Sequence, residues 1–318
     1  MSEASLEVIL LKAPLVRERS SPQGRRITHR LYNTGMKVLK RNGEYENISF
    51  DKVLRRLAKL SEDLNIDSTL VAQKVCARIY DGVPTSELDE LAAQLCSSMI
   101  TDHYEYGILA SRIIISNHHK NTSPSFSETI TNLYNNTDNH GKINSLITKE
   151  LYENVMKNKD KLNDFIKYDR DYNFDYFGFK TLERSYLLHI NKKIIERPQQ
   201  LFMRVALGIH GNDLKDALET YDYMSQQYFV HATPTLFNAG TKNGNLSSCF
   251  LIDMEDSIDG MYTVAKECAL ISKNAGGIGF NIHDIRSKNS IVRGSNGRSS
   301  GTIPMLRVFN AISRHVDQ

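Results

Sequence analysis

Residues 245–280 read NLSSCFLIDMEDSIDGMYTVAKECALISKNAGGIGF, and this stretch decides the fold class. A short apolar run begins at Cys249, a helical pattern extends from Ser257 to Ala275, and the second short run GGIGF follows it. Short strands that alternate with helices are typical of α/β units. We therefore predict that residues 229–318 contain the beginning of an α/β domain.

Cys249 raises a chemical question, because most cysteines in apolar runs are small buried residues. The four cysteines have no C-x-x-C or Cys/His spacing, so neither a zinc site nor a disulfide framework is predicted. In a reducing cytosol, a disulfide would more often be transient and catalytic. The pattern around Cys249 alone does not decide between a small buried residue and a chemically active thiol.

The N-terminal half begins with a hairpin signal. Asn42 and Gly43 separate the strand-like runs MKVLKR and EYENISF. Helical apolar spacing follows, and we expect Asp51, Ser68 and Thr85 to cap the first three helices. A fourth helical pattern is YGILASRIIISNHHK. These patterns predict an α+β domain of one hairpin and about four helices.

The polar connector NTSPSFSET divides this first domain, residues 36–127, from a helical domain at 128–228. Residues 1–35 form a basic arm without a sustained period. We expect a disordered extension there, and an electrostatic docking arm is the alternative.

The composition is that of an ordinary globular protein of 318 residues, with 40% hydrophobic and 24% charged residues. A net charge of +3 is too small to indicate a nucleic-acid partner. No apolar run approaches the ~18–20 residues of a membrane span, and the N-terminus lacks the features of a signal peptide. We expect a cytoplasmic protein that binds neither a membrane nor nucleic acid.

Several long stretches of residues 36–318 resemble one family. They are VLKRNGEYENISFDK, ELDELAAQ, YDRDYNFDYFGFKTLERSYLL, ERPQQLFMRVALGIH, HATPTLFNAGT, LSSCFL, DSIDG, CALISKNAGGIG and PMLRVFNAISRHVDQ. The family is that of the large (catalytic) subunits of class I ribonucleotide reductases, of the eukaryotic and viral type. Oxygen-sensitive anaerobic reductases share the first domain, but DYFGFKTLERSYLL and LSSCFL favour class I.

The resemblance implies an ATP-cone at 36–127, the helical N-terminal domain of the large subunit at 128–228, and an incomplete ten-stranded α/β barrel at 229–318. It implies a thioredoxin-dependent ribonucleoside-diphosphate reductase, which makes deoxyribonucleoside diphosphates by thiyl-radical chemistry. The family's chain is longer, so we expect this N-terminal portion to be catalytically incomplete alone. The alternative is a nucleotide-binding regulatory fragment without turnover.

The resemblance gives Cys249 the role of a reducing thiol whose disulfide partner is absent from this chain. It implies a substrate cradle made by Thr233, Ser248 and Gly277. A glycine permits close approach of the backbone to a ligand, since no Cβ intervenes. Without the resemblance, AGGIG is a weak signal, and a tight strand turn is the favoured interpretation.

The resemblance also implies a specificity effector site for deoxyribonucleoside triphosphates. Its residues are Asp256, Ser257, Lys273, Arg286, Arg293 and Gly294. A carboxylate can accept a hydrogen bond from a deoxyribose 3′-OH, while Arg and Lys can hold phosphates. Asp256 could also be a plain N-cap, and the two roles can coexist. The helix from Ser257 to Ala275 would pair with its copy in a second subunit.

The ATP-cone would hold an activity site for ATP or dATP, bound with Mg. Its residues are Lys40, Arg41, Glu46, Asn47, Ile48, Ser49, Phe50, Asp51, Lys52, Thr85, Asp89 and Lys120. ATP and dATP differ by one hydroxyl, so control would act through a shift between assemblies. A solvated basic surface is the alternative for the Lys and Arg residues.

The family scheme places no metal in this chain. A separate small subunit would supply a diiron-tyrosyl radical, and thioredoxin or glutaredoxin would supply electrons. The resemblance also implies self-association as a dimer or a larger assembly.

Overall fold

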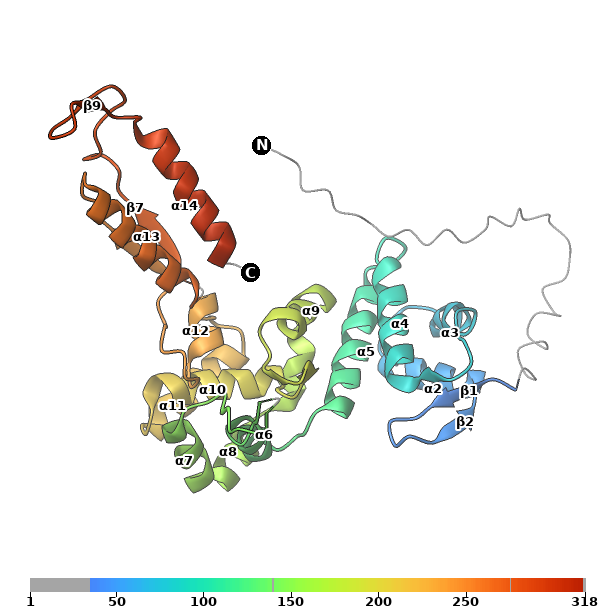
Figure 1. The fold of residues 1–318 in the computed structure, drawn as a ribbon. Coiled ribbons are helices and arrows are strands. Elements are labelled where there is room, and N and C mark those ends of the chain that lie inside the picture. Colours follow the sequence, from blue (N-terminus) through green and yellow to red (C-terminus); the bar gives the residue numbers. More distant parts are fainter. Residues whose placement is uncertain (1–34, 139, 275, 317–318) are drawn as a thin grey trace, which may run out of the picture.

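The structure is a computed structural model that describes residues 35–138, 140–274 and 276–316, so the proposed arm at 1–34 lies outside the described residues. Three hydrophobic cores follow one another along the chain. We name the parts around them the first unit (residues 35–121), the middle unit (122–246) and the third unit (247–316). Figure 1 shows the middle unit between the other two.

The first unit begins with a small sheet. Strand β1 (Lys37–Leu39) pairs with β2 (Tyr45–Asn47) in antiparallel fashion and with β3 (Val83–Pro84) in parallel fashion. The hairpin predicted at Asn42-Gly43 is confirmed. Gly43 has a φ of 86°, a conformation that glycine adopts without the steric cost of a Cβ.

Four helices complete the first unit: α2 (Phe50–Leu60), α3 (Ser68–Cys76), α4 (Thr85–Ser98) and α5 (Glu105–Asn121). The three expected N-caps are wrong by one or two positions. Ser49 precedes α2 and places Asp51 in its first turn, where a carboxylate faces the positive helix end. Asp67 caps α3 by accepting from two backbone N–H groups, and Pro84 precedes Thr85 in α4.

The middle unit is mainly helical. Its helices are α6 (Phe126–Tyr134), α7 (Lys149–Lys157), α8 (Lys159–Phe165), η2 (Tyr168–Asn173), α9 (Tyr176–Ser185), α10 (Pro198–His210), α11 (Leu214–Ser225) and α12 (Thr233–Asn238). The pair β4 (His189–Ile190) and β5 (Lys193–Ile194) precedes α10. Every residue of α10 from Pro198 to Leu207 is buried, so this helix is the centre of the core.

Helix α9 joins the first and middle units. Phe179 of α9 is fully buried in the core of the first unit. Lys180 pairs with Glu90 of α4 at 3.0 Å and with Glu183 of α9 at 2.9 Å. His118 of α5 lies 3.3 Å from the Glu183 carboxylate. The first unit is therefore held to α9 by both apolar and polar contacts.

A buried ion pair organises the end of the middle unit. Arg204 and Glu196, with side chains 0% and 1% exposed, meet at 2.7 Å. Arg204 also donates to the carbonyl oxygens of Ala239 (2.7 Å) and Leu236 (3.2 Å). Two buried charges are tolerated when they are paired and fully hydrogen-bonded, as they are here. The pair thereby ties α10 to the end of α12.

The third unit contains β6 (Cys249–Ile252), α13 (Ile258–Ser272), β7 (Gly277–Phe280), β8 (Ile291–Val292), β9 (Gly297–Arg298) and α14 (Thr302–Val316). Strands β6 and β7 are parallel and α13 connects them, which confirms the predicted α/β unit. Helices α13 and α14 pack together around Val264 and Phe309. The described residues contain this two-stranded parallel pair and no closed barrel.

Within the described ranges, no helix is both long and apolar enough to cross a membrane.

Replacing Arg204 with methionine tests the buried pair. We expect Arg204→Met to lower the free energy of unfolding by about 3–5 kcal/mol, because Glu196 then stays buried without its counter-charge. Urea denaturation followed by circular dichroism measures this loss. Lys149→Ala is the control, since Lys149 and Glu153 are 68% and 62% exposed and such pairs contribute about 0–1 kcal/mol. Equal losses in both variants would contradict the prediction.

Candidate functional site

A pocket of about 420 Å³ lies in the first unit between the β1–β2 hairpin, α2 and α4. Ten of the twelve predicted activity-site residues line it: Lys40, Arg41, Glu46, Asn47, Ile48, Ser49, Lys52, Thr85, Asp89 and Lys120. The other two do not line it. Phe50 packs against the core and Asp51 is exposed at the start of α2.

Asp89 is the centre of the polar side of this pocket. Its carboxylate meets Arg41 and Arg56 at 3.3 Å and Lys120 at 3.2 Å. Arg41 also donates to the hydroxyl of Thr85 at 3.4 Å. Burial lowers the pKa of Lys120, although Asp89 opposes this effect. Three cations around one carboxylate leave positive charge for another anion.

A second cluster extends this positive surface, since Glu46 pairs with both Lys40 and Lys52. The pocket lining thus has five cationic and two acidic side chains, an excess of three positive charges. Apolar residues such as Leu57 and Leu88 also line the pocket. This combination suits a ligand with a planar apolar part and several phosphates.

Arg56 belongs to this site and was not predicted from the sequence. It lies on α2 four residues after Lys52, so both side chains are on one face of the helix. Arg56 donates to Ser116 at 2.9 Å as well as to Asp89. Its helical spacing from Lys52 was the signal that could have identified it.

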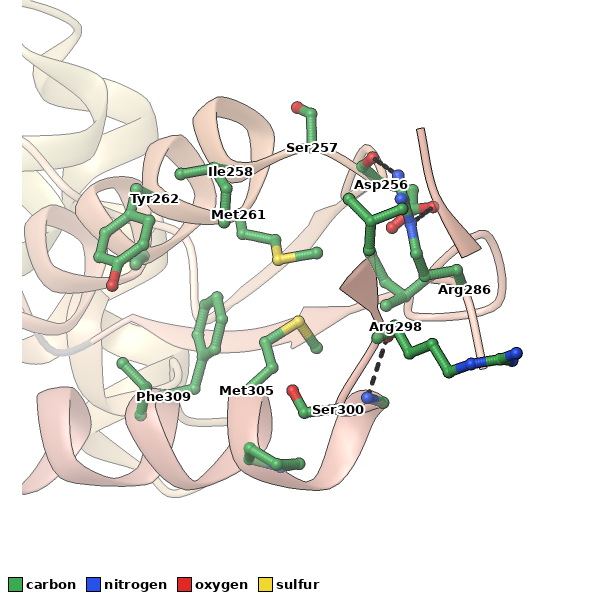
Figure 2. Close-up of a pocket in the computed structure, with 17 residues that line it drawn as sticks. Asp256, Ser257, Ile258, Met261, Tyr262, Arg286, Arg298, Ser300, Met305 and Phe309 are labelled. Atoms are coloured by element: carbon green, nitrogen blue, oxygen red, sulfur yellow. Dashed lines mark hydrogen bonds and ion pairs between the residues drawn. The ribbon is translucent and has the colours of Figure 1, made fainter. Parts of the chain in front are cut away.

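A second pocket, of about 480 Å³, lies between α13 and α14 (Figure 2). Three of the six predicted effector residues, Asp256, Ser257 and Arg286, line this pocket. Arg286 donates to the Asp256 carboxylate at 2.6 Å and to the Asp256 carbonyl at 3.1 Å. Ser257 is the N-cap of α13 and accepts from the Gly260 N–H, so the alternative of Asp256 as the cap is wrong.

The other three predicted effector residues do not line this pocket. Lys273 is the C-cap of α13, at the opposite end of the helix from Ser257. Arg293 and Gly294 lie between β8 and β9, where Gly294 has a φ of 95°. The loop RGSNGRSSG, whose arginines and glycines resemble the family's effector-contacting loop, lines the pocket instead through Arg298, Ser299, Ser300 and Gly301.

Cys249 lies at the start of β6, on the open face of the β6–β7 pair. Cys249 and Leu251 are exposed, whereas Phe250 and Ile252 are half-buried on the other face. The cross-strand partner of Cys249 is Gly277. The thiol is thus accessible, and no side chain stands opposite it.

The two cradle residues beside Cys249 are in contact with each other. The Gly277 N–H donates to the Ser248 carbonyl at 2.7 Å, and a Cβ at position 277 would lie 3.1 Å from that oxygen. The Ser248 hydroxyl lies 3.6 Å from the Cys249 sulfur. The lack of a side chain at Gly277 therefore permits this close packing.

Thr233 is the first residue of α12, and its hydroxyl lies 2.9 Å from that of Tyr186. The same helix holds the segment before Cys249. Thr235 donates to the Leu246 carbonyl at 2.8 Å, and Asn238 donates to the Asn245 carbonyl at 2.8 Å. Helix α12 therefore connects the Arg204 pair to the approach to Cys249.

Cys249 differs from the other three cysteines in exposure. Cys76, Cys96 and Cys268 are buried, and burial raises the pKa of each thiol, to about 12 for Cys96. All four are free thiols. Among the described residues, no group of three or more His, Cys, Asp or Glu side chains could hold a metal ion.

Three family models match successive parts of the chain. The ATP cone domain matches residues 36–121, the all-alpha domain of ribonucleotide reductase matches 172–244, and its barrel domain matches 247–318. The ATP-cone match covers the first pocket, and the barrel match covers Cys249 and the second pocket.

Relatives from distant organisms give the same result. The chain is 56% identical over 286 residues to the ribonucleoside-diphosphate reductase large subunit of Plasmodium falciparum (isolate Dd2). The identity is 54% over 288 residues for the large subunit of Arabidopsis thaliana and 52% over 288 residues for that of Vaccinia virus. Each match covers 89% of this chain and 36%, 35% and 37% of the relative, respectively.

The chain thus spans about a third of the length of these relatives. The three family models follow the order of the first, middle and third units seen in the structure. The chain belongs to the family of ribonucleotide reductase large subunits, whose N-terminal part it matches.

Proposed function

We propose that this chain provides the nucleotide-control sites and part of the substrate cradle of a ribonucleoside-diphosphate reductase. The observation that carries this proposal is the position of Cys249, an exposed thiol on the open face of a parallel strand pair, beside Ser248 and Gly277. A reducing thiol must approach its substrate closely, and this face offers such access. The roles that the resemblance gives to the individual site residues are proposed in the same way.

In the proposed reaction, Cys249 and a second thiol give two electrons and two protons and end as a disulfide, while hydrogen replaces the ribose 2′-OH, which leaves as water. Cys76, Cys96 and Cys268 are buried in the cores of the first and third units, so none is accessible from the face that exposes Cys249. The second thiol would therefore come from polypeptide outside these 318 residues. A small subunit would supply the radical, and thioredoxin or glutaredoxin in the cytoplasm would reduce the disulfide.

A nucleotide-binding regulatory protein without turnover is the second candidate. The observation in its favour is that the chain has two anion-adapted pockets but only one exposed cysteine among the described residues. A reductase assay with a small subunit, dithiothreitol and the polypeptide that supplies the second thiol separates the two candidates. Deoxyribonucleotide formation supports the enzyme, and effector binding without turnover supports the regulatory protein.

The first pocket would bind ATP or dATP with Mg, and Arg41 tests this assignment. We expect Arg41→Ala to weaken ATP binding by about 10- to 100-fold, because a charge-assisted hydrogen bond to phosphate is lost. Calorimetry with Mg-ATP measures the change. Arg55→Ala is the matched control, since Arg55 is an exposed arginine of the same unit that lies on α2 and does not line the pocket. An unchanged affinity for Arg41→Ala would contradict the assignment.

The effector site would be completed by a second copy of the chain. Exposed apolar side chains at Ile258, Tyr262 and Leu270 run along α13 and leave a surface for another helix. If α13 pairs with its copy in antiparallel orientation, the partner's Lys273 comes to the Ser257 end of this helix. The separation of Lys273 from Asp256 and Arg286 then has a physical reason.

Lys273→Ala tests this arrangement. We expect about a tenfold or greater loss in binding of a deoxyribonucleoside triphosphate such as dTTP, and only in dimers, because the lysine would contact phosphate across the interface. Equilibrium dialysis at protein concentrations above and below the dimer dissociation constant measures this. Lys215→Ala on α11 is the control. A loss of equal size in monomers would place Lys273 in the site of its own chain.

Cys249 can be tested by alkylation. We expect N-ethylmaleimide to modify Cys249 well before the other cysteines at pH 8, since burial keeps those three thiols protonated and covered. CDP should slow the modification if the open face is the substrate side. Peptide mass spectrometry after timed quenching identifies the modified residue, and Cys249→Ser is the control. Rapid modification of Cys96 would contradict this result.

A further inference from the structure

Tyr186 contacts Thr233, a predicted substrate-binding residue, from outside the predicted cradle. It is the C-cap of α9, its side chain is half-buried, and its ring packs against Phe237 with centroids 4.9 Å apart. Its hydroxyl lies 2.9 Å from the Thr233 hydroxyl. We propose that Tyr186 is a positioning residue that orients the Thr233 hydroxyl toward the phosphate of a nucleoside diphosphate; this inference rests on the function proposed above.

The direction of the hydrogen bond follows from the number of protons available. A threonine hydroxyl has one proton to donate, and phosphate oxygens accept hydrogen bonds. When Thr233 donates its proton to phosphate, its oxygen can only accept from Tyr186. The tyrosine therefore donates to the threonine, and the threonine donates to the phosphate. Such a chain strengthens each of its hydrogen bonds.

The orientation of the Thr233 hydroxyl depends on a single hydrogen bond. Among the described residues, the Thr233 hydroxyl has Tyr186 as its one hydrogen-bond partner. By contrast, the Thr235 hydroxyl is already committed to the Leu246 carbonyl. Phe237 lies one helical turn after Thr233 on α12, so the residue that supports the Tyr186 ring comes from the same helix as its partner. Helix α12 thus holds both the ring and the hydroxyl of Tyr186.

Tyr186→Phe removes the hydroxyl and keeps the ring against Phe237. In calorimetry on the purified 318-residue chain, we expect CDP to bind about two- to twelve-fold more weakly, the range for one net hydrogen bond. CDP is chosen because its base differs from that of the adenine nucleotides proposed for the first pocket. Tyr223→Phe is the matched control, since Tyr223 is an exposed tyrosine on α11.

A double-mutant cycle with Thr233→Val separates orientation of Thr233 from a general structural effect. We expect Tyr186→Phe to have no further effect on CDP binding once the Thr233 hydroxyl is absent. A merely structural role would give the same loss in both backgrounds. A second readout needs no ligand: NMR three-bond couplings should report one Thr233 χ1 rotamer in the parent chain and an average in Tyr186→Phe.

The outcomes distinguish this inference from the function on which it rests. If the parent chain does not bind CDP, the proposed substrate cradle is wrong and the role of Tyr186 in it is lost. If the parent binds CDP and Tyr186→Phe binds it equally well, the inference alone is overturned. An equal loss in the parent and Thr233→Val backgrounds, or an unchanged Thr233 rotamer, overturns it as well.

Discussion

The buried pair of Arg204 and Glu196 is the interaction on which the arrangement of the proposed cradle depends. Arg204 holds two carbonyls at the end of α12, while Glu196 also accepts from the Leu188 N–H. Neither charge could remain in this core without the other. Because α12 begins at Thr233 and ends beside the segment that leads to Cys249, the ion pair fixes the geometry of both.

The same region is joined to the nucleotide pocket of the first unit. Consecutive residues of α5 face different sides, since Lys120 contacts Asp89 in the pocket while His118 and His119 contact the middle unit. Neighbouring residues of α4 also face different sides, since Asp89 faces the pocket and Glu90 pairs with Lys180 of the middle unit. The ATP-cone is thus packed on the middle unit through the very helices that form its pocket.

The two proposed effector pockets use different physical solutions. In the first unit, cations from one chain surround Asp89 and create an excess of positive charge within that chain. In the third unit, Arg286 is paired with Asp256 and the remaining lysine is at the far end of α13. Local charge therefore suffices for the first proposed site, whereas the arrangement proposed for the second takes Lys273 from another copy of the chain.

The sequence by itself determined the local elements of this protein. The Asn42-Gly43 hairpin, the β6–α13–β7 unit and ten residues of the first pocket were predicted, because each depends on short-range turn chemistry, periodicity or family motifs. Cap positions were missed because each N-cap lies one or two residues before the expected one, and neither Ser49 nor Pro84 caps its helix with a side chain. Tertiary structure alone decided the Arg204–Glu196 pair and the Tyr186–Thr233 contact. These contacts join segments that are separate in the sequence, and tertiary packing rather than local propensity decides which segments meet.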